Sequence, residues 1–277
     1  MNHLTNHVIV VTGAASGIGR QVAIQAAERG GYVIATDVNA VGLAETLKMS
    51  GGERVETQLL DVSKPESILA FAEKTTLSLQ GRPLVLINNA GVALDSGNFD
   101  TTSLEDFEWL LNINLWGVIR MTKAFLPYFL QTNQGHIVNV SSVFGLAGIM
   151  GQSAYCTAKF GVRGFTETLR MELYDTKIAT TVVHPGGIKT NIAHNARAGG
   201  AIDEQTHQKN AELFISELTI TTAAEAARQI LEAVRLKKAK LVIGKDGKQI
   251  DFLTRLLPVR YTKIFLKQLT KAMQKEV

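Results

Sequence analysis

The run His7-Val8-Ile9-Val10-Val11-Thr12-Gly13-Ala14-Ala15-Ser16-Gly17-Ile18-Gly19 decides the fold of this 277-residue chain. Its first half is apolar and β-branched, which predicts a buried strand, and its second half is a glycine-rich turn. The residues that follow have helical periodicity. Gly13 permits a tight turn, while Gly17 and Gly19 would let a pyrophosphate approach the backbone at the helix N-terminus. The run therefore predicts a strand–turn–helix unit that binds a dinucleotide.

The same alternation of strands and helices continues to the last quarter of the chain. Strands are predicted over residues 7–12, 31–36, 54–60, 83–88, 135–141, 178–184 and 240–244. Helices are predicted over residues 17–30, 41–50, 65–80, 103–131, 153–175 and 222–236, the last opened by a capping box at Thr222 and Glu225. Apolar strands that alternate with helices predict a single doubly wound parallel sheet of Rossmann type, with about seven strands and helices on both faces.

Residues 191–221 interrupt this rhythm. A loop of about 30 residues is uncommon inside a compact domain and is usually functional, so a substrate lid is expected there. No repeat, low-complexity tract or interdomain linker divides the chain. We therefore expect one catalytic domain over residues 1–247 and a C-terminal extension over residues 248–277.

Composition and charge exclude several classes of protein. The chain is 45% hydrophobic and 19% charged, which excludes intrinsic disorder. From Arg235 to Val277 there are 12 Lys/Arg and 3 Asp/Glu, so the basic character belongs to the tail and argues against nucleic-acid binding by the folded domain. The single cysteine, Cys156, excludes an internal disulfide, and the six histidines show no metal spacing, so no metal site is expected. No apolar run approaches the length of a membrane span, and the first predicted strand begins too early to leave room for a signal peptide before it. Both observations favour the cytoplasm.

An acidic residue tests the prediction of a dinucleotide site. Asp37 ends the second predicted strand, 18 residues after Gly19, where a carboxylate would accept hydrogen bonds from the adenosine ribose. The same carboxylate would repel the 2′-phosphate of NADP, and positions 38 and 39 are Val and Asn rather than arginine. The sequence therefore favours NAD, with NADP the less favoured cofactor.

Tyr155 and Lys159 carry the chemistry of the candidate site. They stand four residues apart on a predicted helix and so share one face. A tyrosine hydroxyl titrates near ~10, and an adjacent ammonium would favour the phenolate and lower that pKa. Such a pair can exchange a proton with an alcohol or a carbonyl oxygen.

In these motifs the chain resembles the short-chain dehydrogenase/reductase family, over roughly residues 5–245. The shared pattern comprises the turn at residues 12–19, Asp61-Val62, Asn88-Asn89-Ala90-Gly91, Asn114-Leu115-Trp116-Gly117, Ser142 thirteen residues before Tyr155, Lys159, and Pro185-Gly186-Gly187-Ile188-Lys189-Thr190. The resemblance implies a hydride-transferring oxidoreductase that forms a homodimer or homotetramer.

The resemblance also implies a role for each matching residue. Tyr155 would transfer the proton, Ser142 would hydrogen-bond the reacting oxygen, and Lys159 would lower the pKa of Tyr155 and hold the nicotinamide ribose. Asn114 would hold a water that links Lys159 to solvent. The remaining cofactor contacts would come from Gly13, Ser16, Gly17, Ile18, Gly19, Asp37, Asp61, Val62, Asn89, Ala90, Gly91, Pro185, Gly186, Ile188 and Thr190.

The substrate is less defined by the sequence. Apolar residues are expected around it: Ala93, Leu94, residues 143–150, Ile192, Ala193, Leu213, Phe214 and Ile215. Lys189 and Arg197 are the candidate partners for an acidic group. An apolar pocket favours a hydrophobic secondary alcohol or ketone. The alternatives are an NADPH-dependent carbonyl reductase and a dinucleotide sensor without activity.

The basic tail lies largely outside the family pattern. Pro258 fits a helix start, so a helix is predicted from Val259, preceded by a short apolar cluster at Ile250, Phe252, Leu253, Leu256 and Leu257. One face of that helix would carry Tyr261, Ile264, Phe265, Leu269 and Met273, and a neighbouring face Arg260, Lys263, Lys267 and Lys271. The apolar face could pack on its own domain or on a second subunit, contact an anionic membrane peripherally, or remain a free tail.

Overall fold

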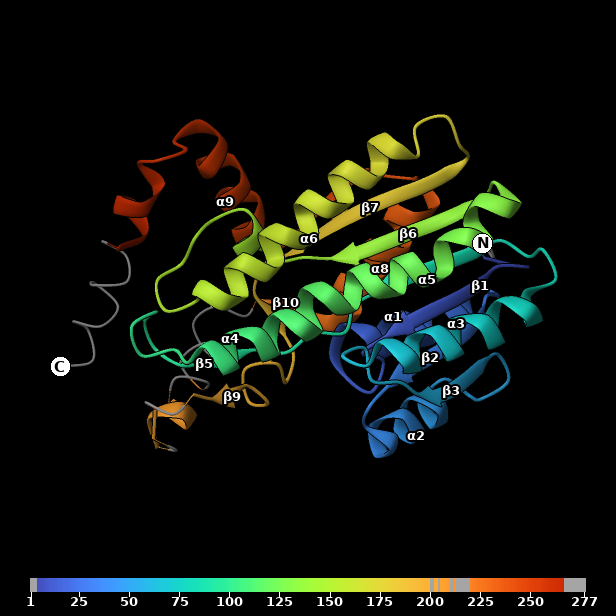
Figure 1. Ribbon diagram of the computed structural model, residues 1–277, viewed down its shortest axis with the longest axis horizontal. Helices are drawn as coiled ribbons and strands as arrows, with labels where there is room; N and C mark the ends of the chain where they lie inside the picture. Colours follow the sequence, from blue (N-terminus) through green and yellow to red (C-terminus); the bar gives the residue numbers. More distant parts are fainter. Residues whose placement is uncertain (1–3, 200–201, 204, 210–211, 213–219, 267–277) are drawn as a thin grey trace.

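A seven-stranded parallel sheet forms the centre of the computed structural model, which describes residues 4–199, 202–203, 205–209, 212 and 220–266. The strand order is β11-β7-β6-β4-β1-β2-β3 (Figure 1). The strands are β1 (Val8–Thr12), β2 (Tyr32–Asp37), β3 (Val55–Leu59), β4 (Leu84–Asn88), β6 (Gly135–Val140), β7 (Ile178–Pro185) and β11 (Lys240–Ile243). Each lies within one residue of a predicted strand at either end. The predicted doubly wound parallel fold is confirmed.

Helices cover both faces of the sheet. They are α1 (Gly17–Glu28), α2 (Ala40–Met49), α3 (Pro65–Leu79), α4 (Leu104–Leu111), α5 (Gly117–Thr132), α6 (Ser153–Glu172), α8 (Ala223–Arg235) and α9 (Lys245–Leu256). The single helix predicted over residues 103–131 is interrupted by a π-helical turn at Asn112–Trp116. Such a turn adds a residue to the helical repeat and is common at functional sites. Here it carries Asn114, one of the predicted site residues.

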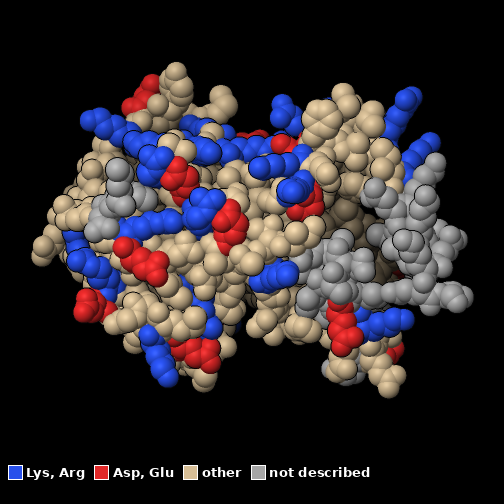
Figure 2. Space-filling model, turned by 180° about the vertical axis from the view of Figure 1, so that it is seen from behind, with Lys and Arg blue, Asp and Glu red and all other residues tan. Residues whose placement is uncertain are grey.

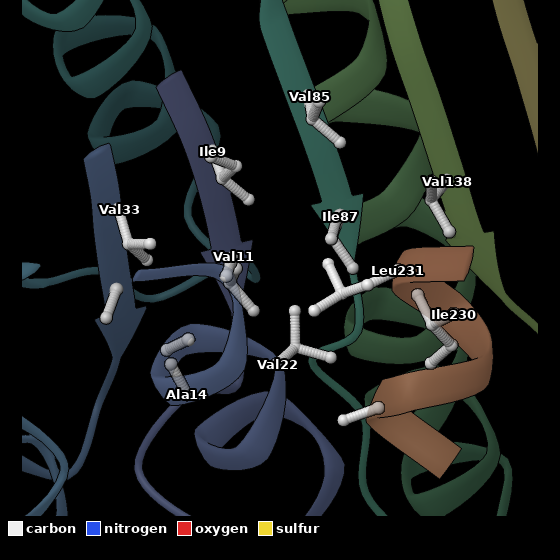
Figure 3. Packing of buried hydrophobic residues seen from close by; sticks show 14 of the residues in the cluster. Ile9, Val11, Ala14, Val22, Val33, Val85, Ile87, Val138, Ile230 and Leu231 are labelled. Atoms are coloured by element: carbon white, nitrogen blue, oxygen red, sulfur yellow. The ribbon is translucent and has the colours of Figure 1, made fainter. Parts of the chain in front are cut away.

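Strand side chains alternate between two buried layers. Ile9 and Val11 of β1 face a layer closed by α1 and α8, which Figure 3 shows with Val22 and Leu231 packed between strands and helices. Val8 and Val10 of β1 face the opposite layer, closed by α3, α5 and α6. Because both faces are covered, only the strand ends are left for polar chemistry.

Two short parallel strand pairs organise the segment beyond β7. β8 (Ile188–Lys189) pairs with β10 (Thr221–Thr222), and β5 (Leu94–Asp95) pairs with β9 (Arg197–Ala198). The described part of the expected lid is thereby attached at both ends to the carboxyl edge of the sheet. The Thr222 hydroxyl accepts a hydrogen bond from the Glu225 N–H at 3.2 Å, as the predicted cap requires, while the Glu225 carboxylate binds Arg228 and Gln229.

The C-terminal segment differs from the sequence prediction. Residues 250–257, expected as a short apolar cluster, belong largely to α9, which begins at Lys245 directly after β11. The expected domain boundary at residue 247 therefore falls inside a continuous helix. The chain turns at residues 257–260 and is helical again over residues 261–266, where a helix from Val259 was predicted. Lys267, Leu269, Lys271 and Met273 lie outside the described residues. Within the described part of the chain, no helix has the length and apolarity to cross a membrane.

Two buried histidines tie stability to pH. His136 on β6 and His184 on β7 are 4% and 0% exposed, and burial lowers the pKa of each to about 4. The unfolded chain, with a histidine pKa near 6.5, therefore takes up protons between pH 6.5 and 4 that the folded state does not. The stabilising contribution is complete above pH 6.5 and is lost as the pH falls.

We expect the free energy of unfolding to fall by about 2 kcal/mol for His136 alone between pH 7 and pH 5. Urea denaturation at the two pH values measures it. The control is His136→Gln, which can retain a hydrogen bond to Thr181 but does not titrate, and which should lose correspondingly less stability. An equal loss in both proteins would contradict the assignment to His136.

Candidate active site

The glycine turn between β1 and α1 is packed against the end of β4. A Cβ atom at Gly19 would collide with the Gly13 carbonyl oxygen, and one at Gly13 would lie 2.8 Å from the Ala90 Cα. Gly13 also has φ +69°, in the left-handed region. The turn therefore accepts no side chain at either position, and α1 begins beside it at Gly17 with free N–H groups. This cradle fits a pyrophosphate.

Asn89 and Thr12 hold this turn in place. The Asn89 side-chain amide donates to the carbonyls of Thr12 and Gly13, at 3.0 and 3.1 Å. The Thr12 hydroxyl accepts from the backbone N–H groups of Asn89 and Ala90, both at 3.0 Å. Four hydrogen bonds thus join the ends of β1 and β4, and they fix the residues expected along the cofactor cleft.

Asp37 ends β2 beside the same turn. Its carboxylate accepts from the Ala15 N–H and from the Asn39 N–H, both at 3.0 Å. The carboxylate is therefore held at the strand end, where a ribose would lie. Arg20, which bonds the Ala15 carbonyl in the same turn, is held by Glu45 and Thr46, and Val38 is exposed. The Asp37 carboxylate thus stands where the sequence analysis expected it, at the end of β2 beside the glycine turn.

The other expected cofactor residues follow the carboxyl edge of the sheet. Asp61 accepts a hydrogen bond from the Ser63 N–H at 2.8 Å, and Val62 packs beside Gly117. Thr190 lies against Gly17, and Ile188 is buried below it. Residues from both ends of this edge border one cleft: Ile18, Asn89, Gly91, Pro185, Gly186, Ile188 and Thr190. Gly13, Ser16, Gly17, Gly19, Asp37, Asp61, Val62 and Ala90 are not among the residues that line it.

Ser142, Tyr155 and Lys159 meet in this cleft. Ser142 follows β6, and its hydroxyl accepts from the Phe144 N–H at 3.1 Å and hydrogen-bonds with Tyr155. Lys159, one turn after Tyr155 on α6, has its Nζ 5.5 Å from the centroid of the tyrosine ring and donates to the Val140 carbonyl at 3.1 Å. The spacing seen in the sequence therefore does place both side chains on one face.

Burial governs the ionisation of this pair. It raises the pKa of Tyr155 to about 12, an effect that the hydrogen bond with Ser142 partly offsets. It lowers the pKa of Lys159 to about 8, so the amine is still largely protonated at pH 7. The sequence led us to expect that the neighbouring ammonium would lower the tyrosine pKa, but burial is the dominant influence here and raises it. The phenol is protonated at neutral pH and is a proton donor in this state.

Asn114 lies behind the cleft rather than in its lining. Its side chain is fully buried and makes two bonds to Val92, accepting from the N–H and donating to the carbonyl, each at 2.8 Å. A Cβ atom at Gly91 would come within 3.2 Å of the Asn114 Oδ1 and 3.5 Å of the Lys159 Nζ. The π-helical turn thus brings Asn114 up to the lysine across the bare backbone of Gly91.

The cleft continues past Tyr155 into an apolar space, with a volume of about 460 Å³ for the whole. Its apolar side chains come from four segments of the chain: Ala93, Leu94, Val143, Phe144, Ile149, Met150, Ile192, Ala193, Ala196, Ile220 and Ile250. Leu213, Phe214 and Ile215, also expected here, lie outside the described residues. Arg197 does not line the cleft, because it pairs with Asp106 at 3.2 Å and stacks on Trp109. Lys189 is exposed and outside the lining.

Two polar side chains that line the cleft, Asp246 and His207, escaped the sequence prediction. Asp246 of α9 accepts from the Gly187 N–H at 2.7 Å, and its other oxygen is buried without a partner in the described structure. His207 of the lid segment contacts Asp95 at 3.0 Å. The position of Asp246, directly after the last strand, was the one available signal, because parallel strands end at the same edge.

His184 supports Ser142 from behind. Its Nδ1–H donates to the Ser142 carbonyl at 2.9 Å, a tautomer that follows because the carbonyl can only accept. Burial keeps the ring neutral at pH 7. The side chain is therefore a structural support for the serine.

Comparison with known proteins agrees with this geometry. The family model described as short chain dehydrogenase matches residues 7–201. A putative oxidoreductase, SadH, from Mycobacterium tuberculosis is 40% identical over 95% of each chain. Retinol dehydrogenase 7 from Rattus norvegicus is 34% identical, over 77% of this chain and 67% of the relative. A short-chain dehydrogenase/reductase from Burkholderia phymatum in complex with NAD superposes with a TM-score of 0.80 at 25% identity, over 96% and 97% of the two chains.

The chain therefore belongs to the short-chain dehydrogenase/reductase family of oxidoreductases, which bind nicotinamide dinucleotides. The family membership inferred from the motifs is confirmed.

The glycine cradle gives a direct test of the dinucleotide site. Gly19→Ala places a methyl group against the Gly13 carbonyl, so the turn must shift and dinucleotide affinity should fall by at least about tenfold, the equivalent of ~1.4 kcal/mol. Gly164→Ala is the matched control, because a Cβ at Gly164 on α6 meets no atom within 4 Å. Titration of NAD followed by tryptophan fluorescence measures both. Equal affinities would refute the cradle.

Proposed function

We propose that the protein is an NAD-dependent oxidoreductase that transfers a hydride between the nicotinamide and a hydrophobic secondary alcohol or ketone. One observation carries the proposal: Ser142, Tyr155 and Lys159 lie together in the cleft, between the expected cofactor residues and the apolar space. The cleft has the volume of a small-molecule site. Bound along the strand ends, NAD would supply the hydride acceptor, and its reduced form the hydride donor.

The chain's own residues would handle the substrate oxygen and its proton. In the reductive direction the Tyr155 hydroxyl, protonated at neutral pH, donates its proton to the carbonyl oxygen. Ser142 hydrogen-bonds the same oxygen and holds it beside the phenol. Lys159 stabilises the phenolate that remains, and Asn114 would hold a water that links the lysine to solvent. In the oxidative direction Tyr155 must be deprotonated before it can accept the proton of the alcohol. The Lys159 ammonium would then favour the reaction by stabilising the phenolate.

The surroundings of the apolar space support a neutral, lipophilic substrate. Among the described lining residues, Lys159 is the one Lys or Arg side chain, and it belongs to the proton-transfer group. Arg197, an expected partner for an acidic substrate, is already held by Asp106 and Trp109. The similarity to a retinol dehydrogenase is consistent with this choice, since its name describes an apolar alcohol as substrate.

The remaining expectations also stand as proposals. We infer that residues 1–247, which include the segment at 191–221, hold the catalytic machinery together with the rest of α9, and that the protein acts in the cytoplasm as a homodimer or homotetramer. The single cysteine, which is buried, and the absence of a membrane-spanning helix among the described residues are consistent with this location. Size-exclusion chromatography with light scattering measures the assembly.

Replacement of Tyr155 tests the proton-transfer role. Tyr155→Phe keeps the ring and its edge contact with Phe144 but removes the hydroxyl. Turnover should fall at least about a hundredfold while NAD affinity persists. The assay uses NAD and NADP with secondary alcohols and ketones of graded size and polarity. Tyr128→Phe, distant on α5, is the control that should keep its activity. Activity of Tyr155→Phe within a few-fold of wild type would overturn the role.

Cofactor choice is tested at the end of β2. The double variant Asp37→Ser, Val38→Arg removes the carboxylate and adds a phosphate partner, so the ratio of kcat/KM should move towards NADP by about tenfold or more. Val38→Arg alone is the control, because it keeps the carboxylate and the Ala15 hydrogen bond. A wild-type protein that already prefers NADP would contradict the argument from Asp37.

A further inference from the structure

The outer face of α9 and the turn after it carry unpartnered apolar side chains. Phe252, Leu256 and Val259 are 67%, 62% and 79% exposed; the spacing of four residues places Phe252 and Leu256 on one side of α9, and Val259 lies in the turn that follows. The opposite side of α9 faces the domain, where Gly247 is buried and Asp251 pairs with Lys240 of β11 at 2.5 Å. Because that side of α9 packs on the domain, the side with Phe252 and Leu256 must point outward.

Five cations belong to the same segment: Lys245, Lys248, Arg255, Arg260 and Lys263. Helical periodicity places the first three on the same side of α9 as Phe252. All five are exposed, and none takes part in an ion pair within the described structure. The two acidic residues of the same segment have partners other than these cations. Asp246 accepts a hydrogen bond from the Gly187 N–H, and Asp251 forms an ion pair with Lys240. Figure 2 shows Lys and Arg side chains projecting around uncharged atoms at the end of the molecule where Figure 1 places α9. We call Phe252, Leu256, Val259 and these five cations the α9 face.

The segment after α9 is anchored to the domain. The Tyr261 hydroxyl accepts from the Gly148 N–H at 3.0 Å, and its ring packs against Phe265 with centroids 5.4 Å apart. Tyr261, Ile264 and Phe265, expected on one apolar face, are all partly buried. The described part of that face therefore packs on its own domain, and a different set of residues is left to meet a partner.

We propose that the α9 face docks the protein on an anionic lipid membrane. Apolar side chains ringed by Lys and Arg suit the boundary between acyl chains and acidic headgroups, where each part of the face has a partner. A second copy fits less well, because a two-fold contact would place the cations of one α9 face against those of the other. A nucleic acid would match the cations but leave Leu256 and Val259 without a partner.

The docked orientation brings the bilayer close to the cleft, with α9 between the two. Ile250 lines the cleft from the side of α9 opposite to Phe252, because residues two apart on a helix point in nearly opposite directions. Met150, which also lines the cleft, is 57% exposed, and the neighbouring Gly148 is bonded to Tyr261. A lipophilic alcohol dissolved in the membrane would reach the proton-transfer group without crossing water. This last consequence rests on the proposed function, whereas the docking itself does not.

Sedimentation of the full-length protein with vesicles tests the proposal. Vesicles of phosphatidylcholine with one third phosphatidylglycerol should bind the protein at low salt, pure phosphatidylcholine should bind it at least about tenfold less, and added salt should release it. The double variants Phe252→Ser, Leu256→Ser and Lys248→Glu, Arg255→Glu should each weaken binding about tenfold or more.

Matched controls separate the α9 face from general stickiness. Leu77→Ser with Met171→Ser changes two apolar side chains on α3 and α6 that are even more exposed than Phe252 and Leu256. Lys48→Glu with Lys74→Glu changes two exposed cations on α2 and α3. Both should bind vesicles as the wild type does. All variants are surface changes, and thermal unfolding checks that each is folded.

The outcomes are decisive and independent of turnover. Vesicle binding that is absent at low salt, insensitive to lipid charge, or unchanged in the α9 variants overturns the proposal. So does displacement of the protein from the vesicles by duplex DNA, which would assign the face to nucleic acid. The α9 variants should still oxidise a water-soluble secondary alcohol. A wild type that binds vesicles but turns over no alcohol or ketone would refute the proposed function and leave the docking intact.

Discussion

The Asn89 amide bonds to the Thr12 and Gly13 carbonyls, and the rest of the site depends on this contact. It draws the turn after β1 against the end of β4 until no room is left for a Cβ at Gly13 or Gly19. The N–H groups at the start of α1 then face the carboxyl edge without side chains in the way. Because parallel strands end at one edge, this cradle lies at the same edge of the sheet as Ser142 and Tyr155.

Burial gives the site its chemistry. The Tyr155 phenol and the Lys159 amine lie where water has been removed, so their pKa values move in opposite directions, to about 12 and about 8. Each pKa shifts because burial disfavours the charged form of the group. An electrostatic influence on a bound substrate is strongest in such a place, because little solvent screens it. The apolar walls that would bind a lipophilic substrate therefore also prepare its proton donor.

The C-terminal segment belongs to the site as well as to the surface. Asp246 holds the Gly187 N–H beneath the expected nicotinamide position, while Ile250 borders the apolar space. One turn further on, the same helix presents Phe252 and Leu256 to the outside. The short helix α9 thus contacts the expected cofactor loop through a hydrogen bond and borders the substrate space through packing. A different side of the same helix forms the exposed basic surface.

The sequence by itself determined the parallel sheet, the glycine turn, and the placement of Tyr155 and Lys159 on one face. These follow from short-range rules, since strand periodicity and a spacing of four residues in a helix need no distant contact. Only the tertiary structure decided the partners of Asp246, His184 and His207, the π-helical turn at Asn114, and the outward side of α9. Each of these depends on which distant segments meet after the chain has folded, as Asp95 meets His207 and Lys240 meets Asp251. The balance of burial against charge at Tyr155 is likewise decided only when the surrounding atoms are in place.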